Sequence, residues 1–222
     1  MNTFKETLFD LAIRRPFLVM LLVLAAVFGA AYGMSKLTFK SDYRIFFGAE
    51  NPQLTAYEKM QATFTKNDSV SFIVVPKDGV VFKEETLTAI HFLTNESWQI
   101  PYTSRVDSVT NYQHTVAEGD DLLVGDLVLE PEFLPDLDMG ELKSIILSEP
   151  LVEKRLVSEA ADVTIVNATV QLPGIDTVTE LPEVVSKVRA IRTSFLENFP
   201  DHDVYLSGII MMNNSFSESA LN

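Results

Sequence analysis

The chain has 222 residues and a formal net charge of −14, with 31 acidic and 17 basic side chains. This acidity argues against nucleic acid and anionic lipid headgroups as partners of the folded part. The absence of cysteine excludes a disulfide framework, a thiolate metal site and a cysteine nucleophile. At this length the chain can form one or two domains with a real hydrophobic core.

An apolar stretch near the N-terminus predicts a transmembrane helix over residues 16–35. These twenty residues contain no charge, and a helix needs about 20 mainly apolar residues to cross a bilayer. The alternative is a cleaved signal peptide, whose apolar region runs to about 7–15 residues behind a short basic start. Here fifteen residues that include Glu6 and Asp10 precede the stretch, so we expect an uncleaved anchor.

Charges beside the apolar stretch predict its orientation. Arg14 and Arg15 adjoin it on the N-terminal side, and basic residues near a membrane favour the cytoplasm. The other flank also carries basic residues, which weakens the signal: Lys36, Lys40 and Arg44. The arginines favour a cytoplasmic N-terminus, so we expect residues 1–15 to be a cytoplasmic interfacial segment at the plasma (inner) membrane. Long domains translocate regardless of their charge, so we expect residues 36–222 to be periplasmic or extracytoplasmic.

We expect a linker over residues 36–51 and then an extracytoplasmic α+β domain over residues 52–210. The domain opens with a helix over 52–65, because Asn51 is a favoured N-cap and proline is favoured at the first helical position. Apolar residues at helical spacing give this helix one apolar face: Leu54, Tyr57, Met60 and Phe64.

Two strand–helix–strand units follow. The first has a strand at 69–75, a helix at 83–97 and a strand near 103–111. The continuous apolar run of its first strand indicates that both faces are covered. The second unit has a strand at 162–172, a helix at 180–199 and a strand at 203–210. Two such units in one small domain are typical of a ferredoxin-like sheet of the split βαβ type.

Each helix of these units carries an apolar stripe that we expect to face the sheet. The stripe residues are Leu87, Ile90 and Leu93 in the first helix, and Val184, Val188, Ile191, Phe195 and Phe199 in the second. In the split βαβ arrangement, the strands near 70–75, 163–171 and 204–210 lie in one sheet.

An acidic insertion separates the two units. Residues 106–142 hold ten acidic and no basic side chains. No spacing there matches an EF-hand loop, so we expect a solvated acidic face rather than a cation site. The insertion also predicts a strand within 122–129, which can pair with the strand before it as a hairpin, and helices near 138–148 and 150–160.

Sequence patterns of catalysis are missing from the chain. His91, His114 and His202 are expected in a helix, a loop and a strand start, and none belongs to an HExxH motif. The chain has no G-x-S-x-G elbow, no P-loop and no G-x-G-x-x-G loop. We therefore expect no enzymatic activity, no catalytic residue, no metal and no cofactor.

The last residues keep helical spacing. Over 211–222 we expect a helix leading toward a second transmembrane helix that lies beyond the sequence. Its larger apolar residues suit a lipid-facing or partner-facing surface, since methionine adapts to many shapes: Met211, Met212, Phe216 and Leu221.

The order of several short motifs resembles the start of a resistance–nodulation–division (RND) transporter, in the MMPL-like branch of predicted exporters of lipids and other hydrophobic molecules. The resemblance covers essentially the whole chain and rests on order and spacing rather than on one specific motif. The motifs are Arg14–Pro16, Ser41–Phe47 (SDYRIFF), Asn51–Leu54 (NPQL), Asn67–Val70 (NDSV) and Tyr205–Gly208 (YLSG).

The resemblance implies a full protein of two similar halves with about twelve membrane helices, in which ferredoxin-like subdomains form the porter domain. It implies that the chain is the N-terminal portion of a proton-driven membrane exporter of hydrophobic or amphiphilic molecules. Its partners are then the remaining transmembrane helices, membrane lipid and a hydrophobic substrate, in an oligomer of the full-length protein. Buried acidic residues of central membrane helices carry the protons in such exporters, whereas the span at 16–35 is uncharged.

Two other functions stay open. The chain can be a complete single-span membrane protein whose outer domain is a binding or scaffold module. A weaker alternative is a membrane-anchored hydrolase whose site has no recognised motif.

Overall fold

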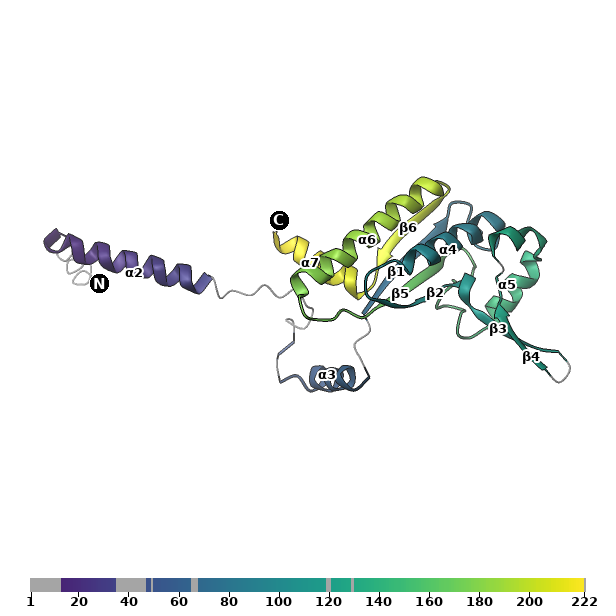
Figure 1. Ribbon diagram of the computed structural model, residues 1–222, viewed down its shortest axis with the longest axis horizontal. Coiled ribbons are helices and arrows are strands. Elements are labelled where there is room, and N and C mark those ends of the chain that lie inside the picture. Colours follow the sequence, from purple (N-terminus) through teal and green to yellow (C-terminus); the bar gives the residue numbers. More distant parts are fainter. Residues whose placement is uncertain are drawn as a thin grey trace. The chain divides into compact units, whose positions relative to one another are not determined.

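The computed structural model describes residues 13–34, 47–48, 50–64, 68–118, 121–128 and 130–221. The chain divides into two compact units, Met1–Lys40 and Ser41–Asn222 (Figure 1). Most of the expected interfacial segment, residues 1–15, and most of the expected linker, residues 36–51, lie outside the described residues.

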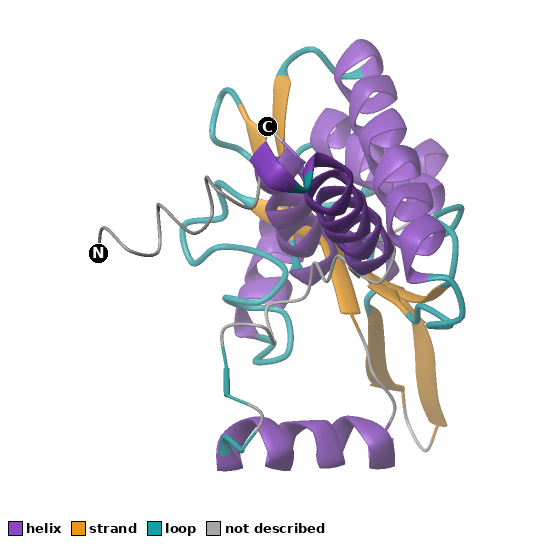
Figure 2. Cartoon of the chain, turned by 90° about the vertical axis from the view of Figure 1, so that its left-hand side faces the viewer, coloured by secondary structure: helices purple, strands orange, loops and turns teal. Residues whose placement is uncertain are grey.

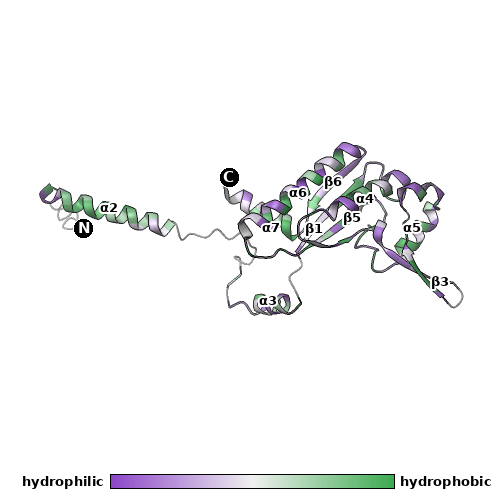
Figure 3. Ribbon diagram, viewed as in Figure 1, coloured by the Kyte–Doolittle hydropathy of each residue, from purple (hydrophilic) through white to green (hydrophobic). Residues whose placement is uncertain are grey.

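The first unit contains helix α2, Pro16–Met34. It has 19 residues, none of them charged and none buried within the protein. Figure 3 shows apolar colouring along most of this helix. The expected helix over 16–35 is confirmed, and its length and composition are sufficient to cross a membrane.

The second unit begins with helix α3, Pro52–Phe64. The expected cap is confirmed, because the Asn51 side-chain oxygen accepts hydrogen bonds from the backbone N–H groups of Gln53 (2.9 Å) and Leu54 (3.2 Å). None of the residues of α3 is buried, and its apolar face includes the exposed side chains of Tyr57, Met60 and Phe64.

Four strands form one antiparallel sheet in the order β2-β5-β1-β6. Their bounds are Asp68–Pro76 for β1, Thr103–Asp107 for β2, Thr164–Val170 for β5 and His202–Ser207 for β6. Helix α4, Glu84–Ser97, connects β1 to β2, and helix α6, Thr177–Asn198, connects β5 to β6. The prediction that the strands of both units share one sheet is confirmed. Each helix-connected pair of strands encloses a strand of the other pair.

Helices cover one face of this sheet. Along β1, Val70, Phe72 and Val74 are fully buried, whereas the alternate residues, such as Ser71 and Ile73, are only half-buried. The expectation that both faces of this strand are covered is therefore wrong. Helices α4 and α6 contact each other and the sheet (Figure 1). Their predicted stripes are confirmed as core at these positions: Leu87, Ile90, Leu93, Val184, Val188, Ile191 and Phe195. Phe199 follows the end of α6 and is only partly buried against this core.

The closing strand is shorter than expected. Strand β6 ends at Ser207, and helix α7, Ile209–Leu221, begins two residues later. The expected strand at 203–210 is thus wrong at its end, and the final helix starts earlier than residue 211. The cause is Gly208, whose φ of +103° ends the extended backbone. Ile210 is buried as a residue of the helix.

The insertion contains a separate hairpin. Strands β3, Gln113–Glu118, and β4, Asp121–Asp126, pair antiparallel as a two-stranded sheet, which lies at the lower right of Figure 2. The predicted strand near 103–111 ends at Asp107, because a capping box between Ser108 and Asn111 starts the 3₁₀ helix η2, Val109–Asn111. The hairpin partner of β4 is therefore β3 rather than the strand of the sheet.

Of the two helices expected in the insertion, only the first forms. Helix α5, Met139–Ser148, follows the 3₁₀ helix η3, Pro131–Asp136. The Asp138 side chain caps α5 by accepting from the N–H groups of Gly140 (2.8 Å) and Glu141 (3.1 Å).

The helix expected over 150–160 is wrong, since this segment consists of turns and isolated bridges. Lys154 has a φ of +61°, which an α-helix does not accommodate. The backbone N–H of Lys154 donates instead to the Val157 carbonyl (2.8 Å), and Val157 bridges to Thr164 at the start of β5. Burial of Val152 and Val157 favours this path over a helix.

Candidate functional site

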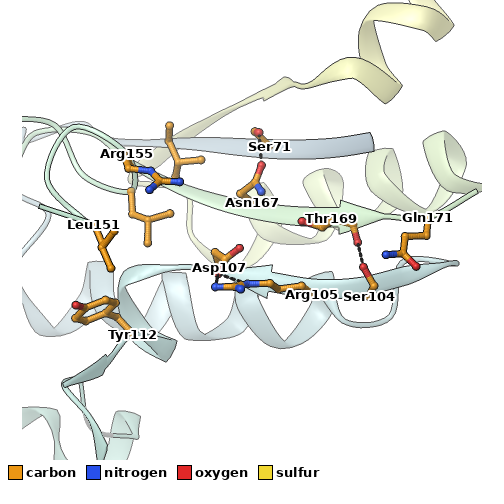
Figure 4. A pocket seen from close by; sticks show the side chains of 12 residues that line it. Ser71, Ser104, Arg105, Asp107, Tyr112, Leu151, Arg155, Asn167, Thr169 and Gln171 are labelled. Carbon is orange, nitrogen blue, oxygen red and sulfur yellow. Dashed lines mark hydrogen bonds and ion pairs between the residues drawn. The ribbon is translucent and has the colours of Figure 1, made fainter. Parts of the chain in front are cut away.

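The uncovered face of the sheet contains a hollow of about 800 Å³. Its volume lies within the range of about 300–1,000 Å³ that is usual for ligand pockets. Strands β1, β2 and β5 and the segment after α5 supply its walls (Figure 4). The lining residues are Ser71, Ser104, Arg105, Asp107, Tyr112, Leu151, Arg155, Leu156, Ile165, Asn167, Thr169 and Gln171.

Strand register places polar side chains in a row across the floor of the hollow. Asn167 of β5 lies opposite Ser71 of β1 on one side and opposite Asp107 of β2 on the other. The Ser71 hydroxyl donates a hydrogen bond to Asn167 Oδ1 (2.8 Å). Within the part of the chain that the structure describes, the Asn167 Nδ2 group has no acceptor, so its two hydrogens are available to a ligand.

Strand β2 forms the outer wall with an ion pair. Arg105 and Asp107 lie two residues apart and therefore point to the same side of the strand. Nε and Nη2 of Arg105 both lie 2.7 Å from Asp107 Oδ1 (Figure 4). The Arg105 side chain is 72% exposed, so this pair contributes only about 0–1 kcal/mol to stability.

The turn-rich segment after α5 forms the opposite wall. Its Leu156 carbonyl accepts hydrogen bonds from the Ile165 N–H (2.8 Å) and the Thr164 hydroxyl (2.9 Å). These bonds and the buried valines of the segment fix it against the beginning of β5. Leu151 and Arg155 are thereby held at the hollow (Figure 4).

Arg155 differs from Arg105 in its pairing. Among the described residues, the Arg155 side chain has no hydrogen-bond acceptor and no carboxylate within ion-pair distance, whereas Arg105 is neutralised by Asp107. The lining thus carries two guanidinium groups and one carboxylate, a formal charge of +1, in a chain whose net charge is −14. Basic groups therefore outnumber acidic groups among the lining residues.

Tyr112 closes one end of the hollow and is itself bonded away from it. Its hydroxyl donates to Glu149 Oε2 (3.1 Å) at the end of α5. Burial, together with this carboxylate, raises the pKa of Tyr112 above its ordinary value, so the phenol is neutral at physiological pH. With Tyr112 bonded elsewhere, the hydrogen-bond donors of the lining include those of Asn167 and the arginines, and the same lining contains aliphatic side chains. This combination suits the binding of a ligand.

The histidines considered from sequence lie outside the lining of this hollow. His91 is buried in α4, and His202 is buried at the first position of β6. His114 lies in β3 rather than in a loop, with its Nδ1 atom 3.5 Å from Glu149 Oε1. In the described ranges, no group of three or more His, Asp or Glu side chains is arranged to hold a metal ion.

His202 is the most constrained of the three. Its Nε2 atom lies 2.9 Å from the Thr86 hydroxyl, whose single proton goes to the Val80 carbonyl (3.2 Å), so Nε2 is the donor. Its Nδ1 atom is buried with no partner among the described residues. Burial is the main cause that lowers the pKa of His202, and the nearby charge of Lys83 adds to it.

The acidic insertion is solvated where the structure describes its side chains. Exposed carboxylates include Asp121, Asp126, Glu130, Glu132 and Asp136. On the last helix, Met211 is buried, whereas Met212 and Phe216 are 39% and 40% exposed. The side chain of Leu221 lies outside the described residues.

Sequence patterns did not identify the hollow, although one signal was present. Ser69 and Ser71 alternate with Val70 and Phe72, and Asn167 and Thr169 alternate with valine and alanine in the same way. This period of two marks a polar face on each strand. The arginines of the walls belong to no motif.

Comparisons with known proteins give no match, either to a family model or to a curated protein. The resemblance to RND transporters therefore rests on the sequence motifs alone.

Proposed function

We propose that the chain is the N-terminal portion of a proton-driven RND-type exporter of hydrophobic or amphiphilic molecules. It would supply the first membrane helix and a porter-type domain. The observation that carries this proposal is the strand order β2-β5-β1-β6, with α4 and α6 as the two crossover helices. Each βαβ unit is split by a strand of the other, and this order supports a ferredoxin-like sheet.

Helix α2 supports a membrane location. An uncharged helix of 19 residues that buries nothing within the protein has no evident place in a soluble core. We propose that it lies in the plasma (inner) membrane, with Arg14 and Arg15 on the cytoplasmic side and the acidic domain outside. In this orientation the acidic domain is surrounded by solvent outside the cytoplasm, and its exposed carboxylates are hydrated there.

The porter domain would provide the route and its selectivity rather than the energy. Proton pathways in membranes need ionisable residues inside the spanning helices, and α2 has none. The coupling residues of the proposed exporter would therefore belong to other helices. A substrate that leaves a bilayer needs a sheltered path with apolar walls, and the uncovered face of the sheet offers aliphatic side chains for one.

Deletion of the coding region in its native cells tests this function for any exported lipid, whatever its head group. Cells are labelled with radioactive acetate, and lipids released to an external acceptor are compared between wild-type, deleted and complemented cells. We expect at least one lipid class to be retained in the deleted cells, and an uncoupler to produce the same retention in wild-type cells. Identical release from wild-type and deleted cells would contradict the proposal.

A second function is favoured by one specific observation. The hollow is built by residues of one domain and needs no second subdomain to complete it, which also suits a single-span binding module. Affinity distinguishes the two functions. An exporter must release its substrate, so weak binding by this domain fits the exporter, whereas tight, saturable binding of a small molecule favours the binding module.

A further inference from the structure

The geometry of the hollow points to a particular class of ligand. We infer that it binds the acidic head group of an aliphatic amphiphile, with Arg155 as the principal contact for the oxyanion. This inference concerns the hollow alone and holds for an exporter and for a binding module alike.

The charge of the hollow is the first argument. The acidity of the chain argues against anionic partners in general, because an acidic chain repels anions at long range. An anion site in such a chain is an exception, and it needs a local cation that is not already neutralised. Arg155 meets this condition among the described residues, since its guanidinium has no carboxylate partner. A planar guanidinium can donate two parallel hydrogen bonds to a carboxylate or phosphate, and charge-assisted bonds of this kind are the strong ones.

Neutral donors near the arginines are the second argument. The Nδ2 group of Asn167 has hydrogens to donate, because the Ser71 hydroxyl occupies only its Oδ1 atom. Figure 4 shows Asn167 between the wall that holds Arg155 and the wall that holds Arg105. An oxyanion bound at Arg155 would satisfy an amide that no described residue satisfies now.

Aliphatic side chains in the same lining define the rest of the ligand. Leu151, Leu156 and Ile165 belong to the same lining as Arg155. Leu151 is 63% exposed, so a ligand chain laid against it would remove apolar surface from water. A small inorganic anion would accept hydrogen bonds from the polar groups but would make no contact with these aliphatic side chains.

The site is held in place before any ligand arrives. Hydrogen bonds from Ile165 and Thr164 to the Leu156 carbonyl tie the wall that carries Arg155 to β5, which also carries Asn167. Binding therefore requires little reordering of the backbone, which favours affinity.

The test uses the full chain in phosphatidylcholine nanodiscs, with calorimetric titration of octanoate and with empty nanodiscs as the blank. We expect saturable binding of octanoate by the wild type. Arg155→Gln should weaken it about tenfold or more, because the charge-assisted bonds are lost. Acetate and inorganic phosphate should each bind at least about tenfold more weakly than octanoate, because they lack the aliphatic contacts.

Two further variants separate the head group from the chain. Lys154→Gln removes one positive charge beside Arg155 but does not touch the lining, and it should change octanoate affinity by less than about twofold. Leu151→Ser should weaken octanoate and leave acetate unchanged, and its exposed position makes misfolding a poor explanation. The inference is overturned if octanoate does not saturate, if Arg155→Gln binds like the wild type, or if phosphate binds as tightly as octanoate.

Discussion

Gly208 lies directly against the backbone of Ser69. A Cβ atom added to Gly208 would stand 2.3 Å from the Ser69 carbonyl oxygen, and the φ of Gly208 is +103°. The contact joins the end of β6 to the beginning of β1, at the point where the chain turns into α7. Both the backbone conformation and the close approach require a residue without a side chain.

Gly208→Ala should therefore destabilise the domain strongly. The unfavourable backbone conformation alone costs about 1–3 kcal/mol, and the clash with Ser69 adds to it. Urea unfolding of the full chain in detergent, followed by circular dichroism, measures the loss. Gly79→Ala is the matched control, because Gly79 also has a positive φ (+72°) but nothing within 4 Å of its added Cβ. Equal losses in the two variants would show that the contact with Ser69 is unimportant.

Phe195→Asp should abolish cooperative unfolding of the domain. Phe195 is fully buried, and its ring centroid lies 5.3 Å from that of Phe199. Removing a buried phenylalanine costs about 3–5 kcal/mol, and the new carboxylate would be buried without a partner. Glu132→Lys, on the solvated insertion, should change stability by less than about 0.5 kcal/mol. Denaturant curves of the two variants test this contrast, and a folded Phe195→Asp protein would refute the assigned core.

Stability should fall as the pH falls below 6.5, because of His202. Burial lowers the pKa of His202 below its ordinary value of 6.5, with Lys83 adding to the effect. The unfolded state therefore binds the proton more readily, so the stability is fully present above pH 6.5 and is lost as the pH falls toward the folded-state pKa. Protonation would place an N–H on Nδ1, which has no acceptor among the described residues.

His202→Gln should reduce this pH dependence below pH 6.5, since the titrating group is removed. His114→Gln serves as the control, because the His114 ring is less buried and lies in the hairpin. Thermal unfolding midpoints at a series of pH values measure both. The same slope in wild-type and His202→Gln proteins would contradict the assignment.

A second acidic transition should appear at lower pH. Arg189 holds Glu218 in a two-bond ion pair, with oxygen–nitrogen distances of 2.8 and 3.0 Å. This pair is the main cause that lowers the pKa of Glu218 from 4.5 to about 2. Its contribution is present above pH 4.5 and lost as the pH falls toward 2. Glu218→Gln should remove that part of the pH dependence, and an unchanged thermal unfolding profile below pH 4.5 would contradict it.

Most elements of the fold could be predicted from local patterns, and the exceptions have tertiary causes. The helical spacing of Leu87 and Ile90 and the β-branched runs of β1 and β5 identified the elements on which the sheet depends. The helix prediction for residues 150–160 was wrong, because burial of two valines and bridging to β5 outweighed helix propensity. The predicted end of β6 was wrong because Gly208 ends the strand where its backbone meets Ser69, and Ser69 is remote in sequence.

The candidate site could not be predicted from sequence patterns. The four residues Ser71, Arg105, Arg155 and Asn167 come from separate segments of the chain. The strand order brings three of them to one face, and the hydrogen bonds of the segment after α5 to β5 add Arg155. Alternation along β1 could have revealed a polar face, but the pairing of Arg105 with Asp107 and the lack of a partner for Arg155 among the described residues depend on side-chain positions.

The central claim is that α2 anchors the acidic domain on the outer side of a membrane. Because the chain has no cysteine, single cysteines report topology without interference. Ser186→Cys lies on the exposed side of α6, and Ile13→Cys lies just before α2. We predict that the chain stays in the membrane fraction after a carbonate wash. A membrane-impermeant maleimide should label Ser186→Cys in intact cells, and it should label Ile13→Cys only after lysis. The reverse labelling pattern, or recovery of the chain in the soluble fraction, would contradict the claim.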